Sequence, residues 1–165
     1  MRLLIISDTH GMHRYVNDVI SRVKPDLMYH LGDALGMEDE LEAWAGCPCE
    51  CVRGNCDFGS SLPAYVVTTL GRHRVFLTHG HLYDVKYTMR SLVNAAKEND
   101  CDVVMYGHTH YPELTEEEGV TILNPGSISL PRQPGREPSF VVCDVDAEGE
   151  LHFNINYIKG ADYAF

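Results

Sequence analysis

The first third of the chain alternates short apolar segments with amphipathic ones, and this alternation limits the folds open to it. Residues 2–7, 27–31 and 50–53 read as short strands, the first of them buried. Between them, apolar residues recur at helical spacing and predict helices over residues 12–23 and 37–45. The resulting β-α-β-α-β order predicts parallel strands joined by right-handed crossovers. In such sheets, ligands bind at the carboxyl ends of the strands.

The second half of the chain follows a different order. Segments 65–70 and 74–78 flank Gly71-Arg72 and predict a β-hairpin, and an amphipathic helix is predicted over 89–96. Further strands are predicted over 102–106, 112–116, 120–123, 138–145 and 150–158, with a turn over Asn124 to Ser127 and a mobile loop over 130–138. A chain of 165 residues without a repeat or linker is expected to form a single domain, residues 1–165.

The composition narrows the function classes. A hydrophobic fraction of 44% and a charged fraction of 22% are those of a globular protein, and no apolar run approaches the ~18 residues of a membrane span. Asp8 directly follows the short apolar N-terminal stretch, so we predict no signal peptide and a cytoplasmic location. A net charge of −11 argues against stable nucleic-acid binding, which relies on Lys and Arg contacts to phosphate. Carboxylates do suit divalent cations, which then supply the positive charge that a phosphate requires.

Four of the six cysteines lie close together, at Cys47, Cys49, Cys51 and Cys56. Their spacing differs from the paired C-x(2–4)-C pattern of structural zinc sites. Without a signal peptide, reduced thiols are expected, with Cys49 and Cys51 packing on one face of a short strand as small apolar residues. The alternative is a thiol-based metal or redox module centred on Cys47 to Cys56.

Polar side chains follow five of the predicted strands, and every one is a competent metal ligand. They are Asp8 with His10, then Asp33, Asn55, His79, and the pair His108 and His110. Taken singly, each has an ordinary structural explanation, such as a helix cap at Asp8 or a left-handed turn at Asn55. Taken together, they predict a metal site, because Asp, His and Asn suit borderline divalent metals. Asp33 lies between the two halves of the set, and its two carboxylate oxygens suit it to bridge two ions.

The same residues occur as five ordered motifs: Asp8-x-His10, Gly32-Asp33, Gly54-Asn55-x-Asp57, His79-Gly-His81 and Gly107-His108-x-His110. This set resembles the calcineurin-like metallophosphoesterase superfamily. The Gly-Asn-Cys-Asp variant and the Asn124-Pro125-Gly126-Ser127 segment make the chain most similar to the YfcE-type phosphodiesterases. The resemblance implies an α/β fold (α+β by some schemes): a four-layer αββα sandwich of two mixed β-sheets flanked by helices.

The resemblance also implies two divalent ions, with manganese favoured and nickel, cobalt, iron or zinc as alternatives. One ion would be held by Asp8, His10, Asp33 and His110, and the other by Asp33, Asn55, His79 and His108. We choose His79 over His81 as the ligand because His79 directly ends its strand. His81 is then expected to face the substrate.

The implied activity is that of a metal-dependent phosphoesterase, above all a phosphodiesterase acting through a hydroxide that bridges the two metals. Asp33, Asn55, His81 and Cys56 are the expected catalytic residues. Many superfamily members have histidine where this chain has Cys56, and a thiol is a poorer acid near neutrality. We therefore expect a preference for good leaving groups, or another acid such as His81 or His13. Short loops around Arg53, Phe58 and 130–138 are expected to set specificity.

The expected partner is a small phosphate ester, with neither nucleic acid nor membrane, and a homodimer or homotetramer is considered as the assembly. The alternative function is a non-catalytic scaffold, because the retromer subunit resembling this family uses the same fold for protein contacts. A scaffold can lose ligands, whereas all seven positions here carry competent ones. The natural substrate, the physiological metal and the choice between monoester and diester are not set by the sequence.

Overall fold

The computed structural model describes residues 1–160, so residues 161–165 of the predicted 1–165 domain lie outside the described residues. The first of its two five-stranded sheets has the order β10-β9-β1-β2-β3. Its strands are β1 (Arg2–Ile6), β2 (Leu27–His30), β3 (Cys49–Cys51), β9 (Ser139–Val145) and β10 (Leu151–Tyr157). β1, β2 and β3 run parallel to one another, as predicted, while β9 pairs antiparallel with β1 and with β10.

The second sheet has the order β4-β5-β6-β8-β7. Its strands are β4 (Tyr65–Leu70), β5 (His73–Thr78), β6 (Val103–Met105), β7 (Pro112–Glu117) and β8 (Val120–Pro125). β4 and β5 form the predicted hairpin, and β5, β6 and β8 run parallel to one another. β7 closes the sheet as an antiparallel edge strand. Both sheets are therefore mixed.

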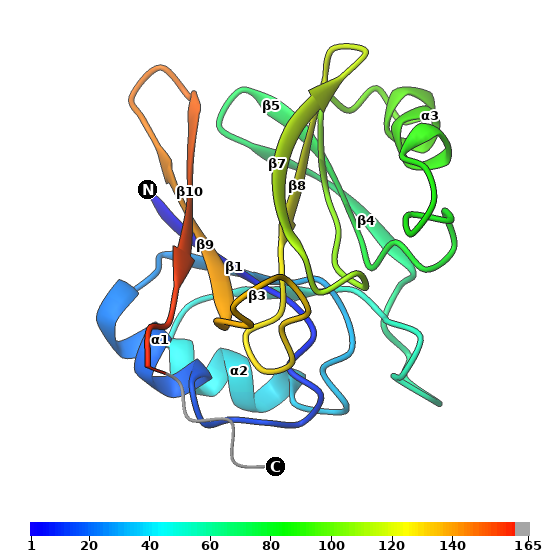
Figure 1. Ribbon diagram of the computed structural model, residues 1–165. Helices are drawn as coiled ribbons and strands as arrows, with labels where there is room; N and C mark the ends of the chain where they lie inside the picture. The colour runs from blue at the N-terminus through cyan, green and yellow to red at the C-terminus, as the bar shows by residue number, and fades with distance from the viewer. Residues whose placement is uncertain (161–165) are drawn as a thin grey trace.

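The two sheets pack face to face, with helices on their outer sides (Figure 1). Leu3 and Ile5 of β1 point into the core between the sheets, and Leu4 and Ile6 point toward α1 (Val16–Val23) and α2 (Glu38–Ala45). This burial on both faces explains the continuous apolar run of β1, because successive side chains alternate across a sheet. On the second sheet, α3 (Arg90–Glu98) packs against Phe76 and Val104. The predicted four-layer αββα sandwich is confirmed.

Several predicted boundaries were wrong. The first helix begins at Val16 rather than at Met12, and residues before it form turns in which Met12 N–H donates to Thr9 O and Val16 N–H to His13 O. Met12 is 39% exposed and so does not belong to the buried stripe that predicted the helix. Asn124 and Pro125, predicted as the start of a turn, instead complete β8.

The third strand spans Cys49–Cys51 rather than residues 50–53, because Arg53 N–H leaves the sheet to donate to Pro63 O. Cys49 Sγ and Cys51 Sγ lie 3.5 Å apart, so the two side chains share a face as predicted. Within residues 1–160, no helix combines the length and apolarity needed to cross a membrane.

Candidate metal centre

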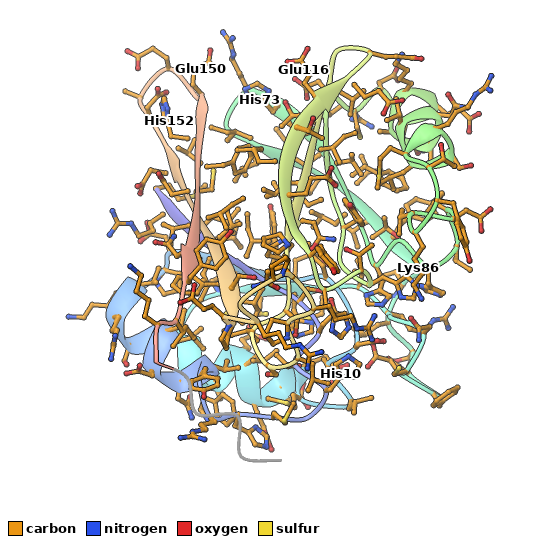
Figure 2. The ribbon with its side chains drawn as sticks, viewed as in Figure 1. His10, His73, Lys86, Glu116, Glu150 and His152 are labelled. Carbon is orange, nitrogen blue, oxygen red and sulfur yellow. The ribbon has the colours of Figure 1, made fainter. Side chains whose placement is uncertain are left out.

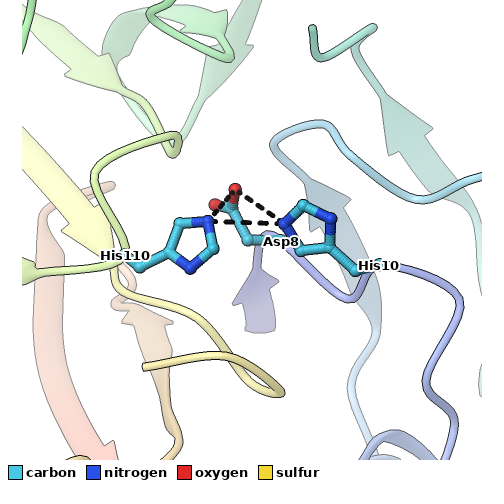
Figure 3. Close-up of side chains that lie close together, drawn as sticks. All are labelled: Asp8, His10 and His110. Carbon is cyan, nitrogen blue, oxygen red and sulfur yellow. Dashed lines mark hydrogen bonds and ion pairs between the residues drawn. The ribbon is translucent and has the colours of Figure 1, made fainter. Parts of the chain in front are cut away.

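The loops after β1 and β6 bring one group of predicted ligands together. His10 Nε2 lies 3.4 Å from His110 Nε2, and Asp8 Oδ1 lies 3.0 Å from His110 Nε2 and 3.8 Å from His10 Nε2. Figure 3 shows both imidazoles turned toward the carboxylate from opposite sides. These residues are 100 positions apart in sequence, so the site depends on the pairing of the whole sandwich.

A second group of predicted ligands lies around His79, at the end of β5. Its Nε2 is 3.2 Å from Asn55 Oδ1, 3.4 Å from Asp33 Oδ2 and 3.9 Å from Asp8 Oδ1. Asp33 Oδ2 is also 3.7 Å from His10 Nε2. Asp33 therefore faces both groups, as its predicted bridging position requires.

Two of the histidines are fixed in a ligand-ready orientation by the main chain. His79 Nδ1 lies 2.6 Å from Leu31 O, and His110 Nδ1 lies 2.5 Å from Leu130 O. A carbonyl only accepts, so each Nδ1 carries a proton and donates it, and Nε2 is the ring atom that remains for a ligand. Metal-bound histidines show the same arrangement, with the second ring nitrogen donating to a carbonyl or carboxylate.

Asp8 presents a buried oxygen that lacks a donor. Its Oδ2 accepts hydrogen bonds from Ser7 Oγ at 2.6 Å and from His108 N–H at 3.0 Å. Its Oδ1 accepts none within residues 1–160, although His110 Nε2 is close. Both atoms are potential metal ligands, and an unsatisfied buried acceptor is costly. A shared cation would satisfy both atoms, so the donor set fits a metal ion.

The pKa shifts of the carboxylates and of His79 also favour positive charge at the centre. Burial raises the pKa of the Asp8 carboxyl, but the His110 and His79 rings outweigh burial and hold that pKa below its usual value. Burial likewise opposes ionisation of Asp33, yet His79 and the Cys56 backbone N–H lower the pKa of its carboxyl. Burial would lower the pKa of His79, but Asp33 and Asp8 raise it. The buried carboxylates therefore attract positive charge to Nε2 of His79.

The main chain is strained at five of the seven predicted ligands. Their φ angles are positive: Asp8 at 55°, His10 at 48°, Asp33 at 57°, His108 at 67° and His110 at 61°. Residues with a Cβ rarely occupy this region, and strain of this kind persists where the surrounding structure enforces it, most often at functional sites. These positive φ angles turn the chain sharply after each strand. Ligands two residues apart, such as Asp8 and His10, can then both face the centre.

Glycines beside the ligands permit close approach. A Cβ at Gly54 would overlap the carboxylate of Asp33, and a Cβ at Gly107 would overlap the hydroxyl of Ser7 and approach Asp8. These two motif glycines are therefore needed because the neighbouring side chains leave no room for a Cβ, and not because the backbone has a positive φ angle there.

His108 lies beside these groups rather than within the tightest of them. The three groups of close ligand atoms within residues 1–160 are Asp8, His10 and His110; Asp8, Asp33 and His79; and His10, Asp33 and Cys56. The His108 ring stands edge-on to His79, with 5.1 Å between ring centroids. Burial, followed by the charge of His79, lowers the pKa of His108 to about 4. The ring is therefore neutral near pH 7, as a metal ligand must be.

The other predicted catalytic residues lie at different distances from the centre. His81 sits 5.4 Å from His79 between ring centroids, and its buried Nδ1 has no hydrogen-bond partner within the described residues. Cys56 Sγ accepts a hydrogen bond from Asn55 Nδ2 at 3.2 Å, and burial and Asp33 raise the pKa of its thiol to about 11. His13, the alternative acid, packs edge-on against Trp44 with its Nδ1 3.7 Å from Glu40, so the structure does not join it to the centre.

Asp57 is a positioning residue for which the sequence analysis gave no role. Its Oδ2 accepts hydrogen bonds from Asp33 N–H at 2.8 Å and Gly54 N–H at 2.7 Å, and its Oδ1 accepts one from Leu35 N–H at 2.7 Å. It thereby joins the loops after β2 and β3. The signal was present, because Asp57 closes the Gly54-Asn55-x-Asp57 motif, but its role depends on the loop conformation.

Asn124 and His30 also support the centre and were missed. Asn124 is the second-last residue of β8, and its Nδ2 donates to Gly107 O at 2.9 Å and to Thr109 Oγ1 at 3.0 Å. His30 is buried at the end of β2, where its ring contacts Thr9 Oγ1 and accepts Gly32 N–H. Both residues lie at the carboxyl end of a strand, so the strand-end rule that predicted the ligands could have identified them.

The remaining cysteines take no part in these groups. All six thiols are free, and the close ligand groups within residues 1–160 include Cys56 but none of Cys47, Cys49 and Cys51. Cys47 and Cys49 instead pack against the cluster beneath α1 and α2. This packing favours the apolar interpretation of the three cysteines over a thiol metal module.

Known proteins share both the sequence and the fold. The model of the calcineurin-like phosphoesterase superfamily domain matches residues 1–148. The probable metallophosphoesterase YsnB of Bacillus subtilis (strain 168) is 37% identical over 134 residues, which cover 80% of this chain and 78% of YsnB. The phosphodiesterase YfcE of Escherichia coli (strain K12) is 34% identical over an alignment of 179 residues that covers 93% of each protein.

Two solved structures resemble the sandwich. A predicted phosphoesterase from Streptococcus pneumoniae TIGR4 superposes with a TM-score of 0.80 at 31% identity, covering 96% of this chain and 93% of that one. Zinc-bound Vps29 from Entamoeba histolytica superposes with a TM-score of 0.76 at 20% identity, covering 95% and 99%, and at that identity it shows the fold alone. The family model, the relatives and the strand-end motifs agree, and the chain belongs to the calcineurin-like phosphoesterase superfamily.

Proposed function

We propose that this protein is a metal-dependent phosphodiesterase with two divalent ions. Asp8, His10, Asp33 and His110 would hold one ion, and Asp33, Asn55, His79 and His108 the other. The observation that carries the proposal is the unsatisfied Asp8 Oδ1 facing the Nε2 atoms of His110 and His10. Membership of a phosphoesterase family and a relative named phosphodiesterase support the reaction class.

The bound ions would supply Lewis-acid charge for the phosphoryl oxygens and a hydroxide nucleophile near neutral pH. The chain supplies the geometry. Asp33 faces both groups of ligands, and its Oδ1 is held by Cys56 N–H at 2.7 Å. His81 lines a small hollow together with His108, and its ring would meet a phosphate oxygen of the substrate from there.

The proposed ligands are carboxylate, amide and imidazole groups, a set that suits borderline divalent ions. Manganese is the ion that the family resemblance favours, and nickel, cobalt, iron and zinc suit the same donors. The cytoplasmic location and the homodimer or homotetramer stay predictions.

The test is a metal-reconstituted assay with bis-(p-nitrophenyl) phosphate and p-nitrophenyl phosphate across manganese, nickel, cobalt, iron and zinc. We expect hydrolysis with manganese, faster turnover of the diester, and loss of both in Asp33→Asn. Metal binding without hydrolysis of either ester by any of the loaded forms would contradict the enzyme. It would support the alternative, a metallophosphoesterase-fold scaffold, for which the likeness to Vps29 offers the fold alone.

Cys56 gives the proposed enzyme a second testable property. A cysteine thiol is a poorer proton donor near neutrality than histidine, so without another acid such as His81 leaving groups depart largely unassisted. We expect rates to fall steeply as the leaving-group pKa rises across a series of aryl phosphodiesters. Cys56→His should flatten this dependence, and Cys56→Ser should leave it steep. A flat dependence in the unmodified protein, with chemistry rate-limiting, would contradict the idea.

A further inference from the structure

Two hollows flank the metal centre, and they differ in charge. The acidic hollow, about 680 Å³, follows β3 and is lined by Glu38, Asp39, Cys56 and Phe58 among others. The basic hollow, about 540 Å³, follows β5 and β6 and is lined by Lys86, Met89, Tyr106, Tyr111 and Arg132 among others. Because β3 belongs to one sheet and β5 and β6 to the other, the centre lies between the loops that form the two hollows.

The basic hollow is connected to the centre through its lining residues. Thr109, which lies between His108 and His110, forms part of its wall. Lys86 also lines a smaller hollow of about 60 Å³ together with His81 and His108. Arg132 N–H donates to His110 O at 3.2 Å, which fixes the other side of the wall to the same loop. Figure 2 shows Lys86 at the same end of the molecule as His10.

The cations of the basic hollow are available to a ligand. Lys86 and Arg132 are exposed, and neither forms an ion pair within residues 1–160. The hollow also contains one carboxylate, Glu113, whose Oε2 accepts a hydrogen bond from Tyr106 Oη at 2.6 Å. That bond occupies an oxygen of Glu113 within the protein. In the acidic hollow, by contrast, Glu38 and Asp39 would repel an anion.

The apolar part of the basic hollow suits an aromatic body. Tyr111 is 48% exposed and lies beside Met89 and Pro112 in the lining. Aromatic side chains of this kind offer a stacking surface to a flat ring, and Lys and Arg bind phosphate through charge-assisted hydrogen bonds.

We propose that the basic hollow binds one ester arm of the diester, an arm that combines an aromatic ring with a further phosphate, as a nucleotide does. This inference rests on the proposed phosphodiesterase function, and it names the substrate class. The second, uncharged arm would then lie toward the acidic hollow. Lys86 and Arg132 are the residues that select the charged arm.

A matched pair of substrates tests the proposal with the manganese-loaded protein. Thymidine 5′-(p-nitrophenyl phosphate) and its 3′-phosphorylated form share the reacting bond and the ring, and differ by one phosphate. We expect the 3′-phosphate to raise kcat/KM about 5- to 30-fold, mainly through KM, as two partly exposed ion pairs can provide. In the double variant Lys86→Gln/Arg132→Gln, the ratio of the two kcat/KM values should fall to about 1.

Lys24→Gln is the control, because Lys24 is an exposed lysine after α1, on the far side of the other sheet. It removes one positive charge and should leave the ratio of kcat/KM values unchanged. A ratio near 1 in the unmodified protein, or a ratio that the double variant does not lower, would overturn the proposal.

Binding without turnover separates this proposal from the proposed function. The dissociation constants of thymidine 3′,5′-bisphosphate and thymidine 5′-phosphate are measured by calorimetry on the unmodified protein and the double variant. A preference for the bisphosphate that the double variant loses supports the subsite, even where no ester is hydrolysed. Hydrolysis without any preference for the bisphosphate overturns the subsite while the phosphodiesterase stands.

Discussion

The two ends of the sandwich both gather histidines and carboxylates, but they use them differently. At the end away from the metal centre, His73 Nδ1 lies 2.7 Å from Asp102 Oδ2 and its Nε2 lies 3.3 Å from Glu150 Oε2. His152 Nε2 lies 2.7 Å from Asp146 Oδ2, and Arg72 pairs with Glu150. Figure 2 shows His73, Glu150 and His152 at this end and His10 at the other.

The difference lies in what remains for a ligand. At the far end, both ring nitrogens of His73 already have carboxylate partners within the chain. At the metal centre, His79 and His110 donate their Nδ1 protons to carbonyls and turn their Nε2 atoms toward Asp33 and Asp8. The two arrangements of the same residue types therefore differ: one balances charge within the chain, and the other leaves ligand atoms that suit a cation.

The largest expected effect comes from replacing one carboxylate by an amide at the metal centre, compared with the same kind of change at the far end. Asp33→Asn removes the oxygen that faces both ligand groups, and we expect hydrolysis to fall by more than about 100-fold, beyond the loss typical of residues that only support a ligand. Bound manganese, measured by elemental analysis, should fall toward one ion per chain. Glu150→Gln is the matched change at the far end and should leave metal content and rate unchanged. Equal losses in the two variants would mean that the comparison is wrong.

A smaller effect is expected at Asp57, which positions the ligand loops. Asp57→Asn replaces one acceptor oxygen by an NH₂ group that opposes a backbone N–H, and three hydrogen bonds to the carboxylate are weakened. We expect a loss of about 2–4 kcal/mol in the free energy of unfolding and about 10- to 100-fold in metal affinity. Urea denaturation and a metal titration measure the two. A stability loss without any change in affinity would show that Asp57 supports the fold alone.

The sequence was sufficient to predict which side chains gather at the centre, because each follows a strand that its own local pattern marks. The arrangement of the layers could not be predicted from local patterns alone. β1 pairs with β9 through contacts such as Leu3 with Cys143, and no local period reveals a partner so distant in sequence. The four-layer sandwich therefore followed from the family resemblance rather than from hydrophobic periodicity.

The sequence pattern could not predict the roles of residues whose position depends on loop conformation. The periodicity around Met12 matched a helix, yet these residues form the turns that carry the chain past His10 to Val16. Histidine is a common general acid, but the turn directs the His13 ring toward Trp44. The spacing of residues in the sequence indicates which side chains are neighbours. The direction in which a side chain points depends on backbone angles that the sequence pattern does not specify.

The histidines at the two ends are expected to change the stability of the protein with pH in opposite directions. Burial lowers the pKa of His30 from 6.5 to about 4 in the folded protein. Between these values the unfolded chain binds a proton that the folded chain does not, so stability falls as pH drops from about 6.5 to 4. In the metal-free protein we expect His30 to account for about 3 kcal/mol of this loss. The measurement is urea denaturation at several pH values, compared with His30→Gln, whose loss over this window should be smaller.

His152 provides the control at the far end, with the opposite sign. Asp146 raises the pKa of His152, so its contribution is present below the unfolded pKa and is lost as pH rises through the folded pKa. His152→Gln should therefore leave the acid-induced loss below pH 6.5 intact. If His152→Gln reduced that loss as much as His30→Gln, the buried histidine would not be its source.

The smallest effect is expected from His73, which links the two sheets at the far end. Its ring joins Asp102, beside β6, to Glu150, beside β10, but its partners are exposed to solvent, which weakens such pairs. We expect His73→Gln to lower the free energy of unfolding by about 1 kcal/mol or less, with metal content and hydrolysis unchanged. Denaturation and elemental analysis on the same sample measure both. A fall in metal content would mean that the sheets transmit strain from one end to the other. An unchanged metal content would agree with ligand loops held by contacts near the centre, such as those of Asp57 and Asn124.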